Sequence, residues 1–145
     1  MRVKKLDIAF VPLYNRSMDI IIDSSCIIAV LLNEDEGDKV IEKTRRANLY
    51  SAACLPYEIG NSLTSAVKRH RISAEEAVLL YNEYLKIPVR LLEPDITKAV
   101  KLAADEKHYA YDAYYIACAI DTGTALYSLD NDMMEIARKR GVTCL

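Results

Sequence analysis

The sequence predicts an α/β protein: a three-layer α/β/α sandwich around a mostly parallel central sheet of four to five strands. Short β-type runs alternate with longer helical patterns along the chain, and no repeat or linker divides it. Strands separated by helices of this length pair in parallel and are covered on both faces. A chain of 145 residues suits one hydrophobic core. We therefore expect one domain at 18–145, preceded by an N-terminal extension, residues 1–17, whose role the sequence leaves open.

The first half of this domain is expected to hold two strands and three helices. A run of β-branched residues marks the first strand, and Pro56 suits the first turn of the third helix. In order, we expect a strand at 19–22, helices near 25–33 and 35–47, a strand at 48–52 and a helix at 56–71.

The second half shows clear helix boundaries. Ser73 and Glu76 form a capping box, and Gly123 and Gly141 are typical helix stops. In order, we expect a helix from 73 to about 86, a strand within 87–93, a helix from 95 to about 107, an apolar helix at 110–120, a strand at 124–129, a helix at 131–140 and a terminal edge strand at 142–144.

The overall charge excludes some function classes. A formal net charge of −2 gives no global basic field of the kind that duplex DNA binders carry, so any contact with nucleic acid must be local. No apolar run approaches the roughly 20 residues that span a bilayer, and the start of the chain lacks a signal-peptide cleavage site. We therefore expect a cytoplasmic protein without a membrane partner.

Four widely spaced cysteines give no metal-binding pattern. There is no C-x-x-C pair and the chain has only two histidines, which argues against a structural zinc site. Buried free thiols are the simplest interpretation, and a disulfide stays open if the source is a hyperthermophile. The residues are Cys26, Cys54, Cys118 and Cys144.

Four carboxylates stand at element boundaries. Asp23 and Asp130 directly follow predicted strands, whereas Glu58 and Asp112 lie in the first turns of predicted helices. Helix capping or a favourable helix dipole explains each one singly. Four acids at the same kind of boundary nevertheless favour a shared site, because chemistry in such sheets lies at the carboxyl ends of the strands, near the switch point in strand order.

Two neighbouring features extend this site. Asn61 lies on the same polar stripe as Glu58, with short residues that suit a crowded cleft, whereas Ile59 and Leu63 face the core. Several tyrosines surround Asp112, and we interpret them as the amphipathic edge of the core, with stacking on single-stranded RNA as the alternative.

Clustered carboxylates repel one another unless a cation compensates them. An all-oxygen set suits Mg²⁺ or Mn²⁺, one or two ions, and such ions serve phosphodiester hydrolysis. Other acid chemistries fit less well: a haloacid-dehalogenase-type phosphatase needs an Asp where Ser25 stands, a receiver domain needs an acidic pair before Asp23, and nothing suggests a sugar cleft.

In order and spacing, four segments resemble a PIN domain, and most closely the VapC-type toxin ribonucleases of type II toxin–antitoxin pairs. The resemblance covers about residues 18–144, and its carriers are MDIIIDSSCIIAVLLNE, LPYEIGNSL, YDAYYIACAI and ALYSLDNDM. It implies a PIN-like fold, Mg²⁺- or Mn²⁺-dependent endoribonuclease activity, a homodimer and inhibition by a small VapB-type antitoxin.

The resemblance also implies roles for single residues. The metal-binding acids fall on Asp23, Glu58, Asp112 and Asp130, and Ser25 matches the hydroxyl that orients the first Asp. Ser128 stands where the family often has Thr, and Asp132 is either an outer ligand or only a helix cap. Two alternatives stay open: a non-catalytic PIN fold that binds RNA or protein, and an RNA-processing PIN nuclease without an antitoxin.

An acidic nuclease still needs local positive charge to hold phosphates. The first candidates are Lys68, Arg69 and Arg71, and the others are Arg45 with Arg46 and Arg138 with Lys139 and Arg140. Each cluster ends a predicted helix, where the dipole favours cations in any case.

Overall fold

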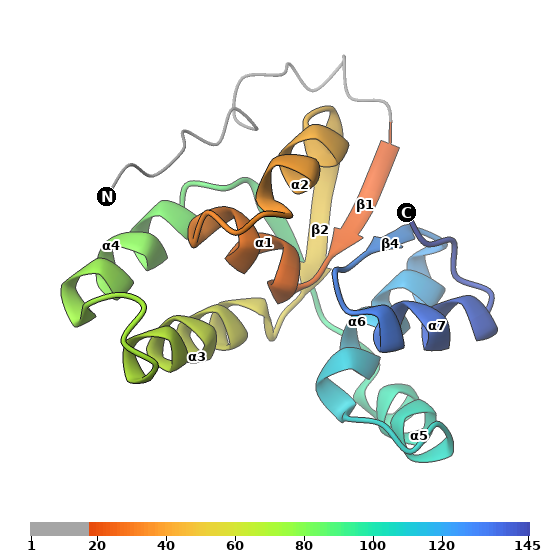
Figure 1. The fold of residues 1–145 in the computed structure, drawn as a ribbon. Helices are drawn as coiled ribbons and strands as arrows, with labels where there is room; N and C mark the ends of the chain where they lie inside the picture. Colours follow the sequence, from red (N-terminus) through yellow and green to blue (C-terminus); the bar gives the residue numbers. More distant parts are fainter. Residues whose placement is uncertain (1–17) are drawn as a thin grey trace.

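A computed structural model of the chain describes residues 18–145, and the predicted extension at 1–17 lies outside the described residues. Within them, four parallel strands form one sheet in the order β3-β2-β1-β4 (Figure 1). The strands are β1 Met18–Ile22, β2 Ala47–Ala52, β3 Val89–Leu92 and β4 Ala125–Tyr127.

Seven helices connect and cover these strands. They are α1 Ser24–Leu31, α2 Gly37–Thr44, α3 Leu55–Lys68, α4 Ala74–Tyr84, α5 Ile96–Asp105, α6 Ala110–Thr122 and α7 Asn131–Lys139. Helices α1 to α4 lie on one face of the sheet, and α5 to α7 lie on the other (Figure 1). The predicted three-layer α/β/α sandwich is therefore confirmed.

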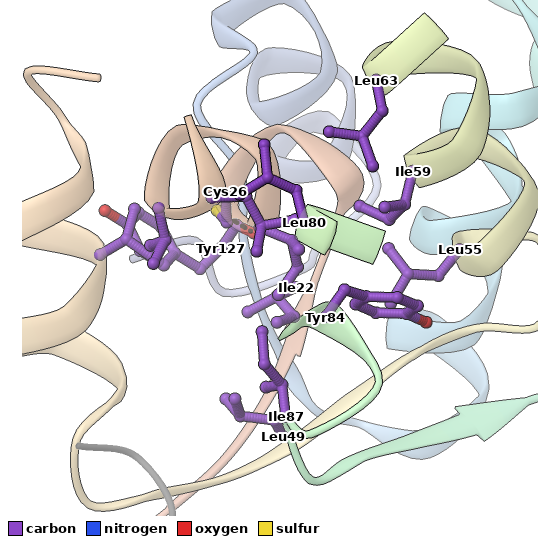
Figure 2. Packing of buried hydrophobic residues seen from close by; sticks show 14 of the residues in the cluster. Ile22, Cys26, Leu49, Leu55, Ile59, Leu63, Leu80, Tyr84, Ile87 and Tyr127 are labelled. Atoms are coloured by element: carbon purple, nitrogen blue, oxygen red, sulfur yellow. Dashed lines mark hydrogen bonds between the residues drawn. The ribbon is translucent and has the colours of Figure 1, made fainter. Parts of the chain in front are cut away.

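The alternation of side chains along β1 divides the core into two clusters. Ile20 and Ile22 face α1 to α4, whereas Ile21 faces α5 to α7, as the period of two in a strand requires. Figure 2 shows members of the first cluster, among them Ile22 and Leu49 from the sheet and Ile59 and Leu80 from the helices. Burial of β1 on both faces explains its continuous apolar run.

The switch point of the sheet lies between β1 and β4. The chain runs from β1 to β2 to β3 in one direction and then returns through α5 and α6 to place β4 on the other side of β1. The carboxyl ends of β1 and β4 are therefore neighbours, and Asp23 and Asp130 follow them. Ligands bind at such crevices in open α/β sheets.

Most predicted elements are present, with shifted ends. The strand expected at 124–129 ends at Tyr127, because the chain turns there so that Asp130 caps α7. The terminal edge strand expected at 142–144 was wrong, since that segment forms only an isolated parallel bridge between Leu126 and Cys144. Gly123, at φ 62°, and Gly141, at φ 80°, end α6 and α7 as predicted.

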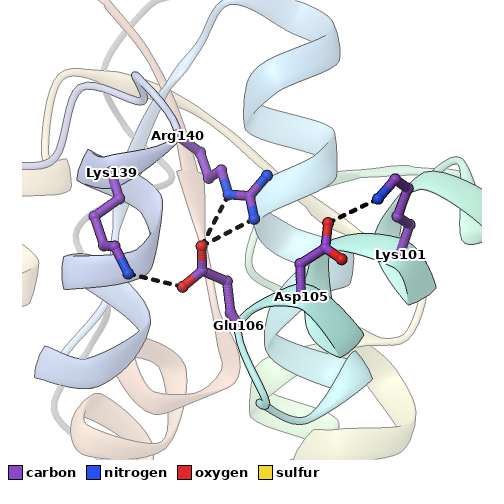
Figure 3. A network of polar contacts seen from close by, with 5 residues as sticks. All are labelled: Lys101, Asp105, Glu106, Lys139 and Arg140. Atoms are coloured by element: carbon purple, nitrogen blue, oxygen red, sulfur yellow. Dashed lines mark hydrogen bonds and ion pairs between the residues drawn. The ribbon is translucent and has the colours of Figure 1, made fainter.

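A network of ion pairs joins the ends of α5 and α7. Glu106 accepts hydrogen bonds from Lys139 at 2.9 Å and from Arg140 at 2.9 Å (Figure 3). The same view shows the separate pair of Lys101 and Asp105 within α5. Two of the three cations in the basic cluster at 138–140 thus have an acidic partner.

Two further expectations concern cysteines and membranes. All four cysteines are free thiols in the structure, with Cys26 and Cys118 buried and Cys54 and Cys144 half-buried. Of the helices formed by residues 18–145, none is long and apolar enough to cross a membrane.

Candidate active site

Asp23 is held at the switch point by hydrogen bonds from the first turn of α1 and from the residue that follows β4. It is the N-cap of α1 and only 5% exposed. Its Oδ1 accepts from the Ser25 hydroxyl at 2.6 Å and from the Cys26 backbone N–H at 3.4 Å, and its Oδ2 accepts from the Ser128 hydroxyl at 2.7 Å. Asp23 thus caps a helix, and both predicted supporting serines contact its carboxylate.

These hydrogen bonds fix Asp23 without neutralising it. Burial raises the pKa of Asp23 to about 6, although the hydrogen bonds from Ser25 and Ser128 oppose the shift. Among residues 18–145, no Lys or Arg is one of the main causes of this shift in pKa. An ionised Asp23 therefore costs folding free energy that a bound cation would offset.

Glu58 lies in the first turn of α3, on the open side of the same edge. Its Oε2 accepts hydrogen bonds from the Tyr115 hydroxyl of α6 and from Cys54 Sγ at 3.3 Å. Burial raises the pKa of Glu58, and the nearby charge of Asp112 adds to the rise. The pKa of Cys54 is raised to about 12, chiefly by burial and then by Glu58, so this residue stays a thiol that donates.

Asp112 lies in the first turn of α6, opposite Glu58. Its Oδ2 accepts a hydrogen bond from His108 Nε2 at 2.5 Å, and both side chains are largely buried. Burial raises the pKa of Asp112, the hydrogen bond from His108 lowers it, and the charge of Asp130 raises it. His108 is thus the partner that fixes the orientation of this carboxylate.

Asp130 and Asp132 lie at the start of α7 and are exposed. Asp130 is the N-cap, and its Oδ1 accepts from the Met133 backbone N–H at 3.1 Å. Its charge reaches Asp112, whose pKa it raises. Asp132 follows in the first turn, and no hydrogen bond to its side chain is found within residues 18–145.

A pocket of about 470 Å³ opens between the first turns of α3 and α6. Its lining residues are Tyr57, Glu58, Asn61, Tyr109, Tyr111 and Asp112. The pocket brings together three of the predicted site residues, Glu58, Asn61 and Asp112, and within residues 18–145 no Lys or Arg lines it. Asp23 is not among the lining residues of the pocket, but the charge of Glu58, which is, contributes to the raised pKa of Asp23.

The four acids form a sequence of interacting charges that fits a hard cation. Each of Asp23, Glu58 and Asp112 has its pKa raised partly by the next acid, ending with Asp130. Oxygen-only donors with uncompensated negative charge suit Mg²⁺ or Mn²⁺. Within residues 18–145, however, no three His, Cys, Asp or Glu side chains already converge on one point in the manner of a preformed metal site.

The predicted RNA-binding cations lie away from this pocket. Lys68 ends α3, Arg69 is its C-cap, and Arg71 pairs with Glu34 at 3.1 Å. Ten residues of helix separate Lys68 from Glu58, which is about 15 Å along the axis. None of the three lines the pocket.

The family of the chain follows from comparison with known proteins. The model of the PIN domain matches residues 20–139, which is most of the chain. The chain belongs to the PIN domain family. The match spans β1 through α7 and therefore includes all four acids.

Relatives of this PIN domain include VapC ribonucleases. Ribonuclease VapC12 from Mycobacterium tuberculosis is 26% identical over 118 residues, which cover 80% of this chain and 90% of that protein. Ribonuclease VapC3 from Pyrobaculum aerophilum is 25% identical over 123 residues, which cover 81% of this chain and 94% of that protein. The predicted resemblance is confirmed by these matches.

Solved structures share the fold of this PIN domain. PAE2754 from Pyrobaculum aerophilum superposes with a TM-score of 0.67 at 20% identity, covering 88% of this chain and 89% of that one. VapBC-1 from nontypeable Haemophilus influenzae gives a TM-score of 0.59 at 16% identity, covering 88% and 97%. At these identities the likeness establishes the fold alone.

Sequence reasoning missed three partners of the acids: His108, Tyr115 and Cys54. A weak signal existed for two of them, since Cys54 precedes Glu58 by four residues and His108 precedes Asp112 by four, whereas Tyr115 of α6 meets Glu58 of α3 only through the tertiary fold. The tyrosines around Asp112 fall into two groups. Tyr115 is buried in the core, whereas Tyr109 and Tyr111 are exposed.

Proposed function

We propose that this PIN domain is a metal-dependent endoribonuclease, the toxin of a toxin–antitoxin pair, with Asp23, Glu58, Asp112 and Asp130 as its metal-binding acids. The observation that carries the proposal is the sequence of interacting carboxylates at the switch point, each raising the pKa of its neighbour. A structural role alone would not require four acids at one edge of the sheet whose charges raise one another's pKa values, because such repulsion destabilises the fold.

The relatives support the activity and the partner. Two curated relatives are named ribonucleases of the VapC type, and a protein of similar fold is named VapBC-1. We extend to this chain an RNA substrate, a VapB-type antitoxin and a homodimer. The cytoplasmic location expected from the sequence belongs to the same proposal.

The divalent ion would supply the charge that activates water and stabilises the phosphate oxygens in phosphodiester hydrolysis. Other residues of the chain fix the carboxylates that would hold this ion. Ser25 and Ser128 hold the Asp23 carboxylate in one orientation, and the Tyr115 hydroxyl and His108 ring do the same for Glu58 and Asp112. Fixed carboxylates need little rearrangement when the substrate arrives, which is the condition for strong electrostatic stabilisation.

Cleavage of end-labelled structured RNA by the purified chain, free of antitoxin, tests the proposal. We expect cleavage with Mg²⁺ or Mn²⁺, none with EDTA, and a loss of at least about a hundredfold in Asp112→Asn, as for other groups that stabilise transition-state charge. Asp121→Asn, which replaces an exposed acid at the far end of α6, is the matched control. Equal cleavage by Asp112→Asn and wild type, or cleavage in EDTA, would overturn the proposal.

A further inference from the structure

Two tyrosine rings beside the acidic pocket extend unusually far into solvent. Tyr109 is 80% exposed and Tyr57 is 79% exposed, whereas the next most exposed large apolar side chain of residues 18–145, Val78, is 63% exposed. A large ring normally buries much of its surface on folding. Both rings therefore keep surface that a ligand can cover.

The two rings come from different elements and meet at one place. Tyr57 precedes Glu58 in α3, and Tyr109 is the N-cap of α6, three residues before Asp112. Both line the 470 Å³ pocket, together with a third ring, Tyr111, which is 56% exposed. The aromatic surface is thus placed directly beside the two acids of the pocket.

Neighbouring rings hold two of these tyrosines without covering both of their faces. Tyr109 contacts the His108 ring at 5.9 Å between centroids with the planes at 62°, and Tyr111 contacts Tyr114 at 5.6 Å with the planes at 79°. An edge-to-face contact of this kind orders a ring but covers at most one of its faces. The remaining face is available for stacking.

The lining of the pocket favours a planar, uncharged group over a bare phosphate. Among the residues that the structure describes, it holds three phenol rings, the Asn61 side-chain amide and two carboxylates, but no Lys or Arg. Aromatic rings stack on nucleobases, and an amide can donate and accept at a base edge. The volume lies in the range of about 300–1,000 Å³ of small-ligand pockets, which suits one nucleotide lifted out of its stack.

We propose that Tyr57, Tyr109 and Tyr111 form a stacking site for unpaired nucleobases, which selects single-stranded RNA segments for the adjacent acids. The inference rests on the proposed ribonuclease function for the identity of the ligand. Bases within a duplex are already stacked on one another, so their faces cannot reach these rings. The site thereby adds affinity for RNA without phosphate contacts, since stacking on aromatic rings does not need a cation.

Fluorescence of 2-aminopurine in a short RNA, titrated with the full chain in EDTA, tests this site. Stacking on a ring quenches the probe, and without a divalent ion the RNA stays intact. We expect Tyr57→Leu and Tyr109→Leu to weaken binding of the single strand about 5- to 150-fold each, because stacking contributes about 1–3 kcal/mol per base. Tyr57→Phe and Tyr109→Phe, which keep the ring, should bind as wild type does.

Two controls separate stacking from other effects. Val78→Ala removes an exposed apolar side chain of α4 outside the pocket and should leave binding unchanged. The same RNA annealed to its complement should bind weakly to every variant. Thermal unfolding of the Leu variants should match wild type, because the two rings are exposed.

The outcomes distinguish the site from the activity. Equal single-strand binding by the Leu and Phe variants, equal binding of single strand and duplex, or no binding by the wild type would overturn the stacking site, and would indicate a protein partner for these rings. Ring-dependent binding in a chain that does not cleave RNA with any metal would support the stacking site and overturn only the ribonuclease proposal.

Discussion

Asp23 shows how one residue serves both the fold and the site. Its carboxylate caps α1 and accepts hydrogen bonds from two serines, yet burial raises its pKa to about 6. The hydrogen bonds therefore compensate only part of the cost of burying a charge. Such a residue is expected where function, and not stability, determines the choice of side chain.

Replacing Asp23 with Asn should stabilise the metal-free fold at neutral pH. In the wild type the folded pKa of about 6 exceeds the unfolded value of 3.8, so stability falls as pH rises from 3.8 through 6. The variant lacks this loss and should be more stable at pH 7 by up to about 3 kcal/mol, at about 1.4 kcal/mol per pKa unit. Chemical denaturation of both proteins in EDTA measures the difference.

The pH dependence of that difference provides its own control. Below the unfolded pKa of 3.8 the Asp23 carboxyl is protonated in both states, so wild type and variant should have nearly equal stability there. A constant difference from pH 3.5 to pH 7 would mean that the effect comes from packing or hydrogen bonding, and would contradict the assigned cause.

Asp130 allows a matched comparison with Asp95, since both are Asp N-caps. Asp95 accepts from the Lys98 N–H at 3.0 Å and Asp130 from the Met133 N–H at 3.1 Å. The Asn variants should lose similar, small amounts of stability, because Asn is also a good N-cap. Only Asp130→Asn should reduce RNA cleavage, by about tenfold or more if its charge helps to hold a divalent ion.

A parallel measurement of melting temperature and cleavage rate for these two variants checks this expectation. Equal cleavage by Asp130→Asn and Asp95→Asn would restrict Asp130 to capping. Asp132→Asn belongs in the same series, since it decides between an outer metal ligand and a residue that only favours the start of α7.

The sequence predicted the acids from their positions after strands and in first turns of helices, and the family resemblance added Ser25 and Ser128 and assigned the roles. It did not predict Tyr115 as a partner of Glu58, because local patterns do not reveal which side chains meet across elements. The partners His108 and Cys54 each lie four residues before their acid, but a spacing of four alone does not indicate a hydrogen bond. The exposure of Tyr109 and Tyr111 was likewise out of reach, since the helix pattern assigns a face but not its neighbours.

At the scale of elements, α1 and α2 approach each other so closely at Gly37 that no larger residue fits there. A Cβ added at Gly37, the first residue of α2, would lie 2.8 Å from the Ala29 carbonyl oxygen of α1. A backbone atom cannot move aside cheaply, so the position requires glycine. Helix α1 is also the helix that Asp23 caps, which connects this contact to the site.

Gly37→Ala should destabilise the fold, whereas Gly60→Ala should stabilise it. The first change forces α1 and α2 apart at a cost of about 1–3 kcal/mol. The second adds a methyl group inside α3 with no atom within 4 Å, which should contribute about 0.5–1 kcal/mol. Melting temperatures of the two variants check the signs, and a stable Gly37→Ala protein would contradict the close approach.

Strong local signals predicted the elements well, and weak ones did not. The Ser73 capping box and the glycine stops at 123 and 141 fall where expected. The segment expected as a strand at 142–144 forms only one bridge, to Leu126, because a strand needs a neighbour to pair with and β4 is only 3 residues long. Strand pairing is a long-range property that a short apolar run cannot specify.

At the scale of the whole molecule, an acidic chain concentrates negative charge at one edge of its sheet. The formal net charge is −2, and Asp23, Glu58 and Asp112 all have raised pKa values, with burial as the largest cause. Lys68 and Arg69 lie at the far end of α3, and Lys139 and Arg140 pair with Glu106 across α5 and α7 (Figure 3). The distances of these cations from the pocket depend on tertiary structure, which the sequence alone does not specify.

A divalent ion bound to these acids, as proposed above, should stabilise the folded state. A ligand that binds only the folded state at 100 times its Kd adds about 2.7 kcal/mol of stability. In a chain of this size that corresponds to a rise in melting temperature of about 5–10 °C. The rise should vanish when an acid that holds the ion is replaced.

The measurement to make is the melting temperature of the wild type, Asp23→Asn and Asp95→Asn at pH 7, in EDTA and with increasing Mn²⁺. The four-acid site predicts a saturable rise in the wild type and in Asp95→Asn, and little or none in Asp23→Asn, which should start from the higher melting temperature in EDTA. Equal rises in all three proteins, or no rise in the wild type, would contradict a metal site built on these carboxylates.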